Sequence, residues 1–338
     1  MTSPQPIQQP TPERFFETAR GFQRSAALKS AIELGVFTKI AEGANTSASL
    51  AQKIGAPERG VRILCDYLTV IGFLTKHDGK YRLSPDSDLF LNEKSPAYIG
   101  CSIEFLCGPA EFNAMQNLTA TIRQGKPQVA SALESDAKMW QSFARSMAPL
   151  LQAGARAMAG QLRLATDREL RVLDIASSHG MWGLAVAERY PKAHIVGLDW
   201  PTVVEVSKEN AAKMGFSSRY STIEGDAFQV DFGGPYDLIL LPNLLHHFDR
   251  DRNETLLKKC HKHLRDGGLV ALAEFVPNED RVSPPMQAEF ALTMLGATEA
   301  GDAYTFPEFK AMLTHAGFRQ IEARPLVGLP QTMIEARK

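Results

Sequence analysis

The sequence predicts an α/β protein whose second half forms an open, mostly parallel sheet and whose first half forms a smaller, mainly helical domain. Three observations lead to this prediction. From about residue 169 onward, apolar strand-like runs alternate with helical patterns, which is typical of a parallel sheet covered on both faces. Small or polar residues follow several of these runs, as they do at the ligand-binding edge of such sheets. Residues 12–95 instead show helices followed by a hairpin signal.

The second half contains short apolar runs separated by segments with helical spacing of apolar residues. The expected strands are RVLDIASSHG (171–180), HIVGLDWP (194–201), IEGDAF (223–228), YDLILLPNLLHHF (236–248), GLVALAEF (268–275) and two closing segments near 319–326 and 331–336. The expected helices are GMWGLAVAERY (180–190), VVEVSKENAAKMG (203–215), RNETLLKKCHKHL (252–264) and FPEFKAMLTHAGF (306–318). The closing strands are predicted to form a hairpin with one antiparallel strand.

The first half has the pattern of a winged helix. The segment TSASLAQKIG (46–55) starts with hydroxyl residues suited to a helix N-cap and ends on a glycine suited to a C-cap. A second helix is expected over VRILCDYLTVIG (61–72), and Asp78-Gly79 then predicts a tight hairpin. DNA binding is disfavoured, because residues 1–92 carry 11 Lys+Arg against 9 Asp+Glu and the second helix is mostly apolar. Association with another subunit explains the apolar surface better.

Composition excludes several classes of protein. The chain has 338 residues and a formal charge of −1, so no electrostatic attraction to nucleic acid or to a membrane surface is expected. No apolar run approaches the roughly 18–20 residues that span a bilayer. The four cysteines lack the paired spacing of a metal site, so we expect no metal, and reduced thiols in a cytoplasmic protein. Residues 1–11 are rich in proline and glutamine and are expected to form a disordered arm.

Residues 96–165 are expected to form a helical connector. Trp140, Phe143 and Met147 recur there at helical spacing, together with other methionines and leucines. This stripe can be ordinary core packing, or it can form a pliable apolar wall beside a flat small molecule, since methionine adapts its shape and favours aromatic contacts. Some positions can serve both purposes.

The turn after the first strand predicts a nucleoside-binding site. Asp174, Ala176, Ser178 and Gly180 line a turn of small residues, which lets a ligand approach the backbone closely. Only the last of these residues is a glycine. The turn has neither the phosphate loop of a nucleotide triphosphate site nor the three-glycine fingerprint of a dinucleotide site.

Acidic residues follow the next two strands. The carboxylate of Asp199 is placed to accept hydrogen bonds from ribose hydroxyls, or alternatively to cap the helix that starts at Pro201. Asp226 is placed to accept from an exocyclic amine, with Ala227 and Phe228 near an adenine ring, or else to form a plain Gly-Asp turn.

This series of motifs resembles the S-adenosylmethionine (SAM) site of class I methyltransferases, and the sequence is similar to the small-molecule O-methyltransferases typified by caffeate and acetylserotonin O-methyltransferases. In the motif NLLHHF at the fourth strand tip, the resemblance implies that His246 is the general base and that Glu274, 28 residues onward, supports it. The alternative for His246 and His247 is that they merely solvate the strand end. The likeness covers nearly the whole chain.

The same resemblance implies roles for further residues and for the domains. Trp200 and Phe248 match apolar cofactor contacts, whereas Met294 and Thr298 match acceptor-lining positions. The cofactor would be SAM, with S-adenosylhomocysteine (SAH) as its product, and the acceptor a hydroxylated aromatic or polyketide-like small molecule. Residues 12–95 would form a winged-helix dimerisation domain of a homodimer, residues 96–165 a connector lining the acceptor pocket, and residues 166–338 a Rossmann-like catalytic domain with a seven-stranded sheet.

Two departures from the family pattern keep other reactions open. The family places a second glutamate beside the histidine, but Ala303 stands at that position, with Asp302 next to it. The cofactor turn also lacks two of its usual glycines. The alternatives are N- or C-methylation, another SAM-dependent reaction on the same fold, and a winged-helix regulator that senses a ligand.

Overall fold

The computed structural model describes residues 10–127 and 137–338, and these residues form two compact units with a boundary between Cys107 and Gly108. Most of the arm expected over residues 1–11 lies outside the described residues. No described helix is both long enough and apolar enough to cross a membrane.

The first unit is mainly helical, with one small antiparallel hairpin. Its elements are α1 (Glu13–Ala19), α2 (Gly21–Glu33), α3 (Val36–Ala41), α4 (Ser47–Ile54), α5 (Glu58–Val70), β1 (Leu74–His77), β2 (Lys80–Leu83), α6 (Pro85–Leu91) and α7 (Ile103–Leu106). Helix α4 starts at Thr46, whose hydroxyl accepts from the Ser49 backbone, and ends at Gly55 in the left-handed conformation. Asp78 and Gly79 join the paired strands β1 and β2. The helix, turn, helix and hairpin predicted for this region are present.

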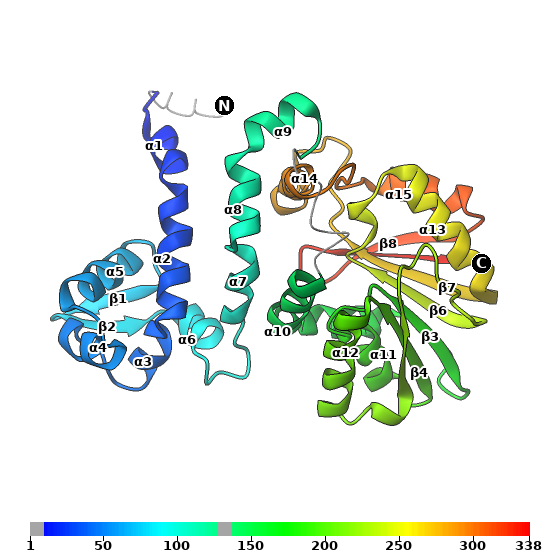
Figure 1. Ribbon diagram of the computed structural model, residues 1–338, viewed down its shortest axis with the longest axis horizontal. Coiled ribbons are helices and arrows are strands. Elements are labelled where there is room, and N and C mark those ends of the chain that lie inside the picture. Colours follow the sequence, from blue (N-terminus) through cyan, green and yellow to red (C-terminus); the bar gives the residue numbers. More distant parts are fainter. Residues whose placement is uncertain (1–9, 128–136) are drawn as a thin grey trace, which may run out of the picture. The chain divides into compact units, whose positions relative to one another are not determined.

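The second unit contains a twisted sheet covered by helices on both faces (Figure 1). Its strands are β3 (Leu170–Ile175), β4 (Ala193–Asp199), β5 (Tyr220–Glu224), β6 (Tyr236–Pro242), β7 (Leu264–Glu274), β8 (Arg319–Pro325) and β9 (Thr332–Arg337). Its helices are α8 (Pro109–Gln116), α9 (Leu118–Gln124), α10 (Ala137–Gln161), α11 (Met181–Arg189), α12 (Pro201–Lys213), α13 (Arg250–His263), α14 (Pro285–Ala297) and α15 (Phe306–His315).

The sheet has the order β5-β4-β3-β6-β7-β9-β8 over the described residues. Every neighbouring pair is parallel except those that involve β9, which runs antiparallel to both β7 and β8. This confirms the Rossmann-like sheet with one antiparallel strand. Since the strand order reverses direction between β3 and β6, the carboxyl ends of these strands border the crevice where ligands bind in such sheets.

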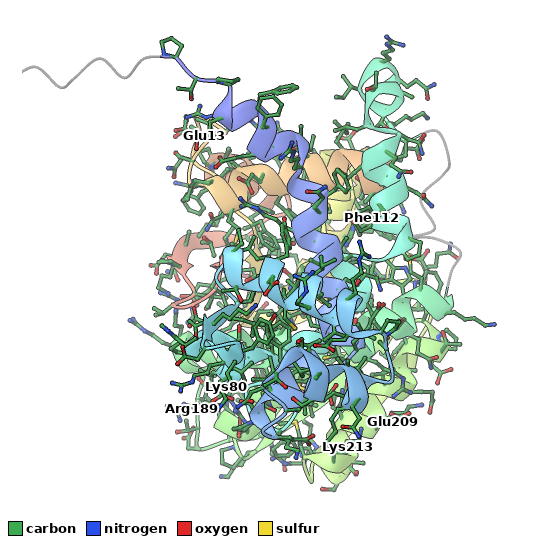
Figure 2. The ribbon with its side chains drawn as sticks, turned by 90° about the vertical axis from the view of Figure 1, so that its left-hand side faces the viewer. Glu13, Lys80, Phe112, Arg189, Glu209 and Lys213 are labelled. Carbon is green, nitrogen blue, oxygen red and sulfur yellow. The ribbon has the colours of Figure 1, made fainter. Side chains whose placement is uncertain are left out.

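Helices α10, α11 and α12 cover one face of the sheet, and α13 and α15 cover the other (Figure 1). Helix α10 is tied to α12 by a bidentate ion pair between Arg145 and Glu209, the latter lying at the surface with Lys213 (Figure 2). The core between the sheet and α13 and α15 contains fully buried side chains such as Leu241, Leu256 and Phe309. This packing fixes the strand tips that carry the candidate site.

Two elements differ from the sequence prediction. The strand expected over residues 223–228 lies at Tyr220–Glu224, three residues earlier. Asp226 cannot extend that strand, because its own carboxylate accepts from the Phe228 backbone and closes a turn. Helix α14 had no counterpart among the predicted elements, since its apolar residues do not gather on one face.

Candidate active site

Strand β6 ends in a short 3-10 turn, η4 (Leu245–His247), that carries His246. The side chain of His246 is buried, and its Nδ1 lies 2.5 Å from Oε2 of Glu274 at the end of β7. The other oxygen, Oε1, accepts hydrogen bonds from the backbone N–H groups of Leu244 and Leu245, at 3.0 and 2.8 Å. Glu274 therefore holds both the ring and the backbone of the histidine turn.

The hydrogen bond to Glu274 determines which ring nitrogen can take a proton. A carboxylate only accepts, so Nδ1 of the neutral His246 ring carries the hydrogen and Nε2 carries the lone pair. Within the described residues, Nε2 makes no hydrogen bond. The pair can therefore accept a proton at Nε2 and stabilise the resulting imidazolium through Glu274.

His247 has a different environment. Its ring lies 4.4 Å from that of His246 and meets the indole of Trp140 edge-on at 5.9 Å. Burial, together with the neighbouring His246, lowers the pKa of His247 well below its usual value. It has no carboxylate partner comparable to Glu274, so of the two histidines His246 has the surroundings of a general base.

Two phenylalanines that the sequence reasoning missed lie against His246. The ring of Phe290 meets the imidazole edge-on at 4.8 Å, and it stacks on Phe275 with 3.9 Å between centroids. Phe290 belongs to α14, one helical turn before Met294, so the two side chains share a face of that helix. The spacing to Met294 was the signal that could have identified Phe290.

The predicted acceptor-lining residues fall on two helices. Trp140, Phe143 and Met147 lie on one face of α10, with the first two rings in edge-on contact at 5.4 Å. Trp140 also packs on Val203 and Val206 of α12, so this part of the stripe combines core packing with the contact to His247. Both Met294 and Thr298 are buried. The Thr298 hydroxyl donates to the Met294 carbonyl and accepts from the Gly301 backbone, which leaves one lone pair available.

The predicted cofactor turn follows β3 and keeps the backbone shape of a glycine turn. Ala176, Ser178 and Gly180 have φ values of 53°, 50° and 77°, all in the left-handed region. For alanine and serine this conformation costs on the order of 1–2 kcal/mol per residue. Asp174 is fully buried beneath the turn, where its Oδ2 accepts from the Gly183 backbone of α11. Burial raises the pKa of Asp174 to about 8.

The carboxylate of Asp199, at the tip of β4, reaches across to this turn. Its Oδ2 accepts from the Ser178 backbone at 2.8 Å, and its Oδ1 accepts from the Trp200 backbone at the start of α12. Burial raises the pKa of Asp199 to about 6. Each oxygen retains a lone pair, so helix capping and ligand binding are compatible here.

The segment after β5 lies beside Asp199, because the Gly225 backbone donates to the Asp199 carbonyl. Asp226 uses Oδ1 to close its turn, leaving Oδ2 with no bond to another described residue. The Phe228 ring contacts Phe248 edge-on at 5.0 Å, and the Arg252 guanidinium lies over both rings. Ala227 is half-buried between Asp226 and Phe228. The predicted adenine contacts are thus gathered at one edge of the sheet.

The residues around this turn fit the adenosine and amino-acid groups of SAM. Two buried oxygens at the turn, Asp174 Oδ1 and Ser178 Oγ, have no hydrogen-bond partner among the described residues. Such atoms are costly when left unpaired, which indicates a ligand that completes their hydrogen bonds. Gly197 of β4 leaves room for the Tyr220 side chain beside the turn, since a Cβ there would lie 2.3 Å from the Tyr220 hydroxyl.

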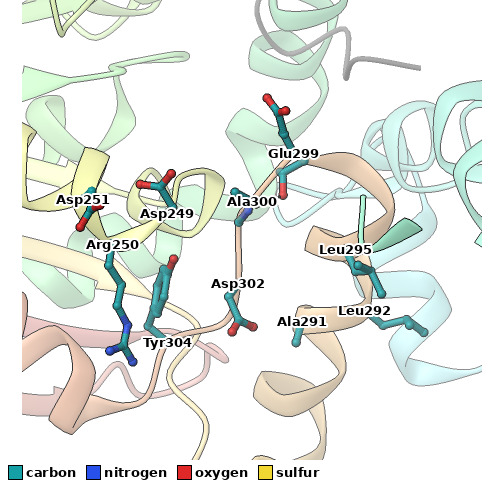
Figure 3. Close-up of a pocket in the computed structure, with 13 residues that line it drawn as sticks. Asp249, Arg250, Asp251, Ala291, Leu292, Leu295, Glu299, Ala300, Asp302 and Tyr304 are labelled. Atoms are coloured by element: carbon teal, nitrogen blue, oxygen red, sulfur yellow. Dashed lines mark hydrogen bonds between the residues drawn. The ribbon is translucent and has the colours of Figure 1, made fainter. Parts of the chain in front are cut away.

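A cavity of about 810 Å³ lies beside the loop that follows α14 (Figure 3), and Thr298, one of the predicted acceptor-lining residues, lines it. Asp249, Arg250 and Asp251 line it from the start of α13, and Asp302 and Tyr304 line it from the loop. None of the predicted cofactor residues lines it. The carboxylate of Asp302 pairs with Arg281 at 3.3 Å and makes no bond to the His246 ring, so it does not replace the absent second glutamate.

Comparisons with known proteins agree with this geometry. Residues 16–93 match the O-methyltransferase dimerisation domain, and residues 116–319 match the O-methyltransferase domain. The chain is 27% identical over 318 residues to the 3-hydroxy-5-methyl-1-naphthoate 3-O-methyltransferase of Streptomyces sahachiroi, covering 92% of this chain and 90% of that protein.

Two solved structures are similar over nearly the whole chain. One is assigned to an O-methyltransferase of Nostoc punctiforme and is 46% identical, with a TM-score of 0.94 and coverage of 98% of this chain and 100% of that chain. The other is human N-acetylserotonin methyltransferase in complex with SAM, which is 23% identical with a TM-score of 0.87 and 99% coverage of both chains, and shows the shared fold.

Proposed function

Because the chain belongs to the O-methyltransferase family, it is a SAM-dependent O-methyltransferase, and we propose that it methylates a hydroxyl group of an aromatic or polyketide-like small molecule with His246 as the general base. The observation that carries this proposal is the buried pair of His246 and Glu274, which leaves Nε2 without a hydrogen bond to any described residue. We further propose that SAM occupies the turn formed by Asp174, Ala176, Ser178 and Gly180. There it supplies an electrophilic methyl group.

The base has to overcome an unfavourable proton transfer. A phenol with a pKa near 10 and a histidine near 6.5 differ by ~3.5 units, or roughly 5 kcal/mol. The Glu274 carboxylate against Nδ1 stabilises the charged imidazolium that forms when the ring takes the proton. The remaining cost is met when the proton leaves in concert with methyl transfer, so the position of Nε2 relative to the acceptor oxygen is decisive.

The proposed acceptor is aromatic because of the side chains beside the base. The ring of Phe290 contacts His246 and stacks on Phe275. The indole of Trp140, from α10, contacts His247. Flat rings suit such surroundings, since aromatic pairs gain about 0.5–1.5 kcal/mol beyond the burial of their area. The naphthoate named for the Streptomyces sahachiroi relative is an acceptor of this kind. Phe143, Met147, Met294 and Thr298 complete the proposed lining.

Cofactor recognition is proposed to involve both acidic strand tips. Asp199 would accept from the ribose hydroxyls and Asp226 from the adenine amine. Ala227, Phe228 and Phe248 would pack near the adenine, and Trp200 beside the ribose. The support comes from the edge-on contact of the two phenylalanines and from the lone pairs that both acidic side chains retain.

We also propose that the chain is a homodimer joined through residues 12–95. The first unit exposes an unusual number of large apolar side chains: Phe15, Phe16, Phe22, Leu34, Ile63, Val70, Leu89, Phe90 and Leu106. Subunit association would remove this area from water. Sedimentation at the mass of a single chain, over micromolar concentrations, would refute the dimer.

The function is tested by a screen of acceptors with isotope-labelled SAM, read by mass spectrometry. The panel contains phenols, hydroxynaphthoates and hydroxyquinones, with matched indoles and anilines that offer nitrogen in place of oxygen. We expect label on a hydroxyl of fused-ring compounds and its loss in His246→Ala. Label found only on nitrogen or carbon, or undiminished in the variant, would contradict the proposal.

A further inference from the structure

The backbone carbonyls of the histidine turn are held by groups from outside it. The Asn253 Nδ2 group of α13 donates to the carbonyls of Leu245 and Phe248, at 2.8 and 3.2 Å. The hydroxyl of Tyr304 donates to the Phe248 carbonyl at 2.7 Å. The backbone N–H of Asp302 donates to the carbonyl of His246 itself at 3.1 Å. Asn253, Asp302 and Tyr304 all follow the turn in the sequence, and all three contact it in the folded structure.

The side chains that make these bonds are buried. Asn253 is fully buried, and Tyr304 is only 4% exposed. Both neighbours of the Asn253 amide are carbonyl oxygens, so its NH₂ group must face them. Burial and nearby acidic groups, first of them Asp302, raise the pKa of Tyr304 to about 12, so its hydroxyl keeps the donated proton at any working pH.

The loop that carries Tyr304 also packs closely against the backbone of the histidine turn, at Gly301. A Cβ added to Gly301 would lie 2.2 Å from the His246 carbonyl oxygen and 3.0 Å from the carbonyl carbon of His247. Gly301, Asp302 and Tyr304 of this loop also line the cavity shown in Figure 3. Arg281 holds this loop through contacts with Asp302, the Ala303 carbonyl and Glu308.

We propose that Asn253 and Tyr304 are positioning residues for the methyl-transfer reaction, because they fix the turn that places Nε2 of His246. This inference rests on the proposed role of His246 as the base. Glu274 holds the ring and the backbone N–H groups at the start of the turn, whereas these two side chains hold the backbone carbonyls of Leu245 and Phe248. A 3-10 turn of three residues has little rigidity of its own. A displacement near 1 Å at a reacting group can cost roughly 100-fold in rate.

The test compares two tyrosine variants that lose the same kind of bond. Tyr304→Phe removes the hydroxyl bonded to the Phe248 carbonyl, and Tyr236→Phe removes a buried hydroxyl bonded to the Phe232 carbonyl, away from the histidine turn. We expect Tyr304→Phe to lower kcat about 10-fold at saturating SAM, on the scale of a positioning effect, with SAH affinity measured alongside to detect any movement of Phe248. Tyr236→Phe should keep kcat at a temperature where both variants are folded by circular dichroism.

A double-mutant cycle separates positioning of the base from a general structural effect. In the His246→Ala background, Tyr304→Phe should cause no further loss, because the group it positions is gone. An equal loss in both backgrounds, or full kcat in Tyr304→Phe alone, would overturn the inference. Gly301→Ala is a second variant for the same test. Its loss of kcat should likewise be seen only when His246 is present. If His246→Ala itself retained the wild-type rate, the proposed function would fail instead, so the two failures are distinguishable.

Discussion

The two halves of the candidate site differ in how the protein holds their acidic groups and backbone. At the histidine turn, Glu274 accepts three hydrogen bonds, and His246 has a fixed ring orientation. At the cofactor turn, Asp174 and Ser178 retain buried oxygens without a partner, and Ser178 adopts a left-handed conformation. The proposed base is thus held in place by the chain, whereas the proposed cofactor turn keeps buried oxygens that a ligand would complete. Substitutions in the two halves should accordingly affect different measurements.

The largest effect is expected for His246→Ala. Removal of the base should lower kcat by at least about 100-fold, the lower range for general base catalysis. The affinity for SAH should change by less than about twofold, because the histidine turn is held by contacts that do not involve the cofactor turn. Single-turnover rates and calorimetry measure the two quantities. A large loss of SAH affinity would show that the two halves of the site are not separable.

Glu274→Gln tests whether catalysis requires the negative charge of this side chain or only its shape. The amide can keep accepting from Leu244 and Leu245 through its oxygen, but its NH₂ group then faces Nδ1 of His246. The imidazole would place its hydrogen on Nε2 and lose the ability to accept a proton there. We expect a loss of kcat of about 10- to 100-fold, on the scale of a general base. Activity equal to the wild type would contradict the proposed tautomer.

The sequence allowed the strand tips to be predicted, because apolar runs that end in small or acidic residues carry that information locally. Asp174, Asp199 and His246 all lie at the carboxyl edge where the pattern placed them. The contact of Phe290 with His246 was not predictable, since it depends on how α14 packs. The pairing of Asp302 with Arg281 likewise depends on a loop whose shape is set by tertiary contacts.

At the cofactor turn, pH should control ligand affinity. Burial raises the pKa of Asp199 to about 6 in the free protein. Between about pH 4 and 6, the folded protein therefore keeps a proton on this carboxyl that the unfolded chain has lost. As pH rises from about 4 through 6, this carboxyl destabilises the free protein, and its ionised form becomes available to accept from a ligand. SAH affinity should therefore increase several-fold between about pH 5 and 7.5. Asp199→Asn should bind more weakly, and titration calorimetry should show a flat profile for it.

The smallest effect concerns the backbone of the same turn. Ala176 has a φ of 53°, a conformation that glycine adopts without strain. Ala176→Gly should remove a strain of about 1–2 kcal/mol, from which the greater chain entropy of unfolded glycine subtracts roughly 0.5–1 kcal/mol. A change of this size raises the midpoint of thermal unfolding by a few degrees, with kcat unchanged. Val172→Gly, in the adjacent buried strand, serves as the control and should instead destabilise. If Ala176→Gly lowered the midpoint as well, the left-handed turn would not be a site of strain, and the contrast with the histidine turn held by Glu274 would rest on the unpaired oxygens of Asp174 and Ser178 alone.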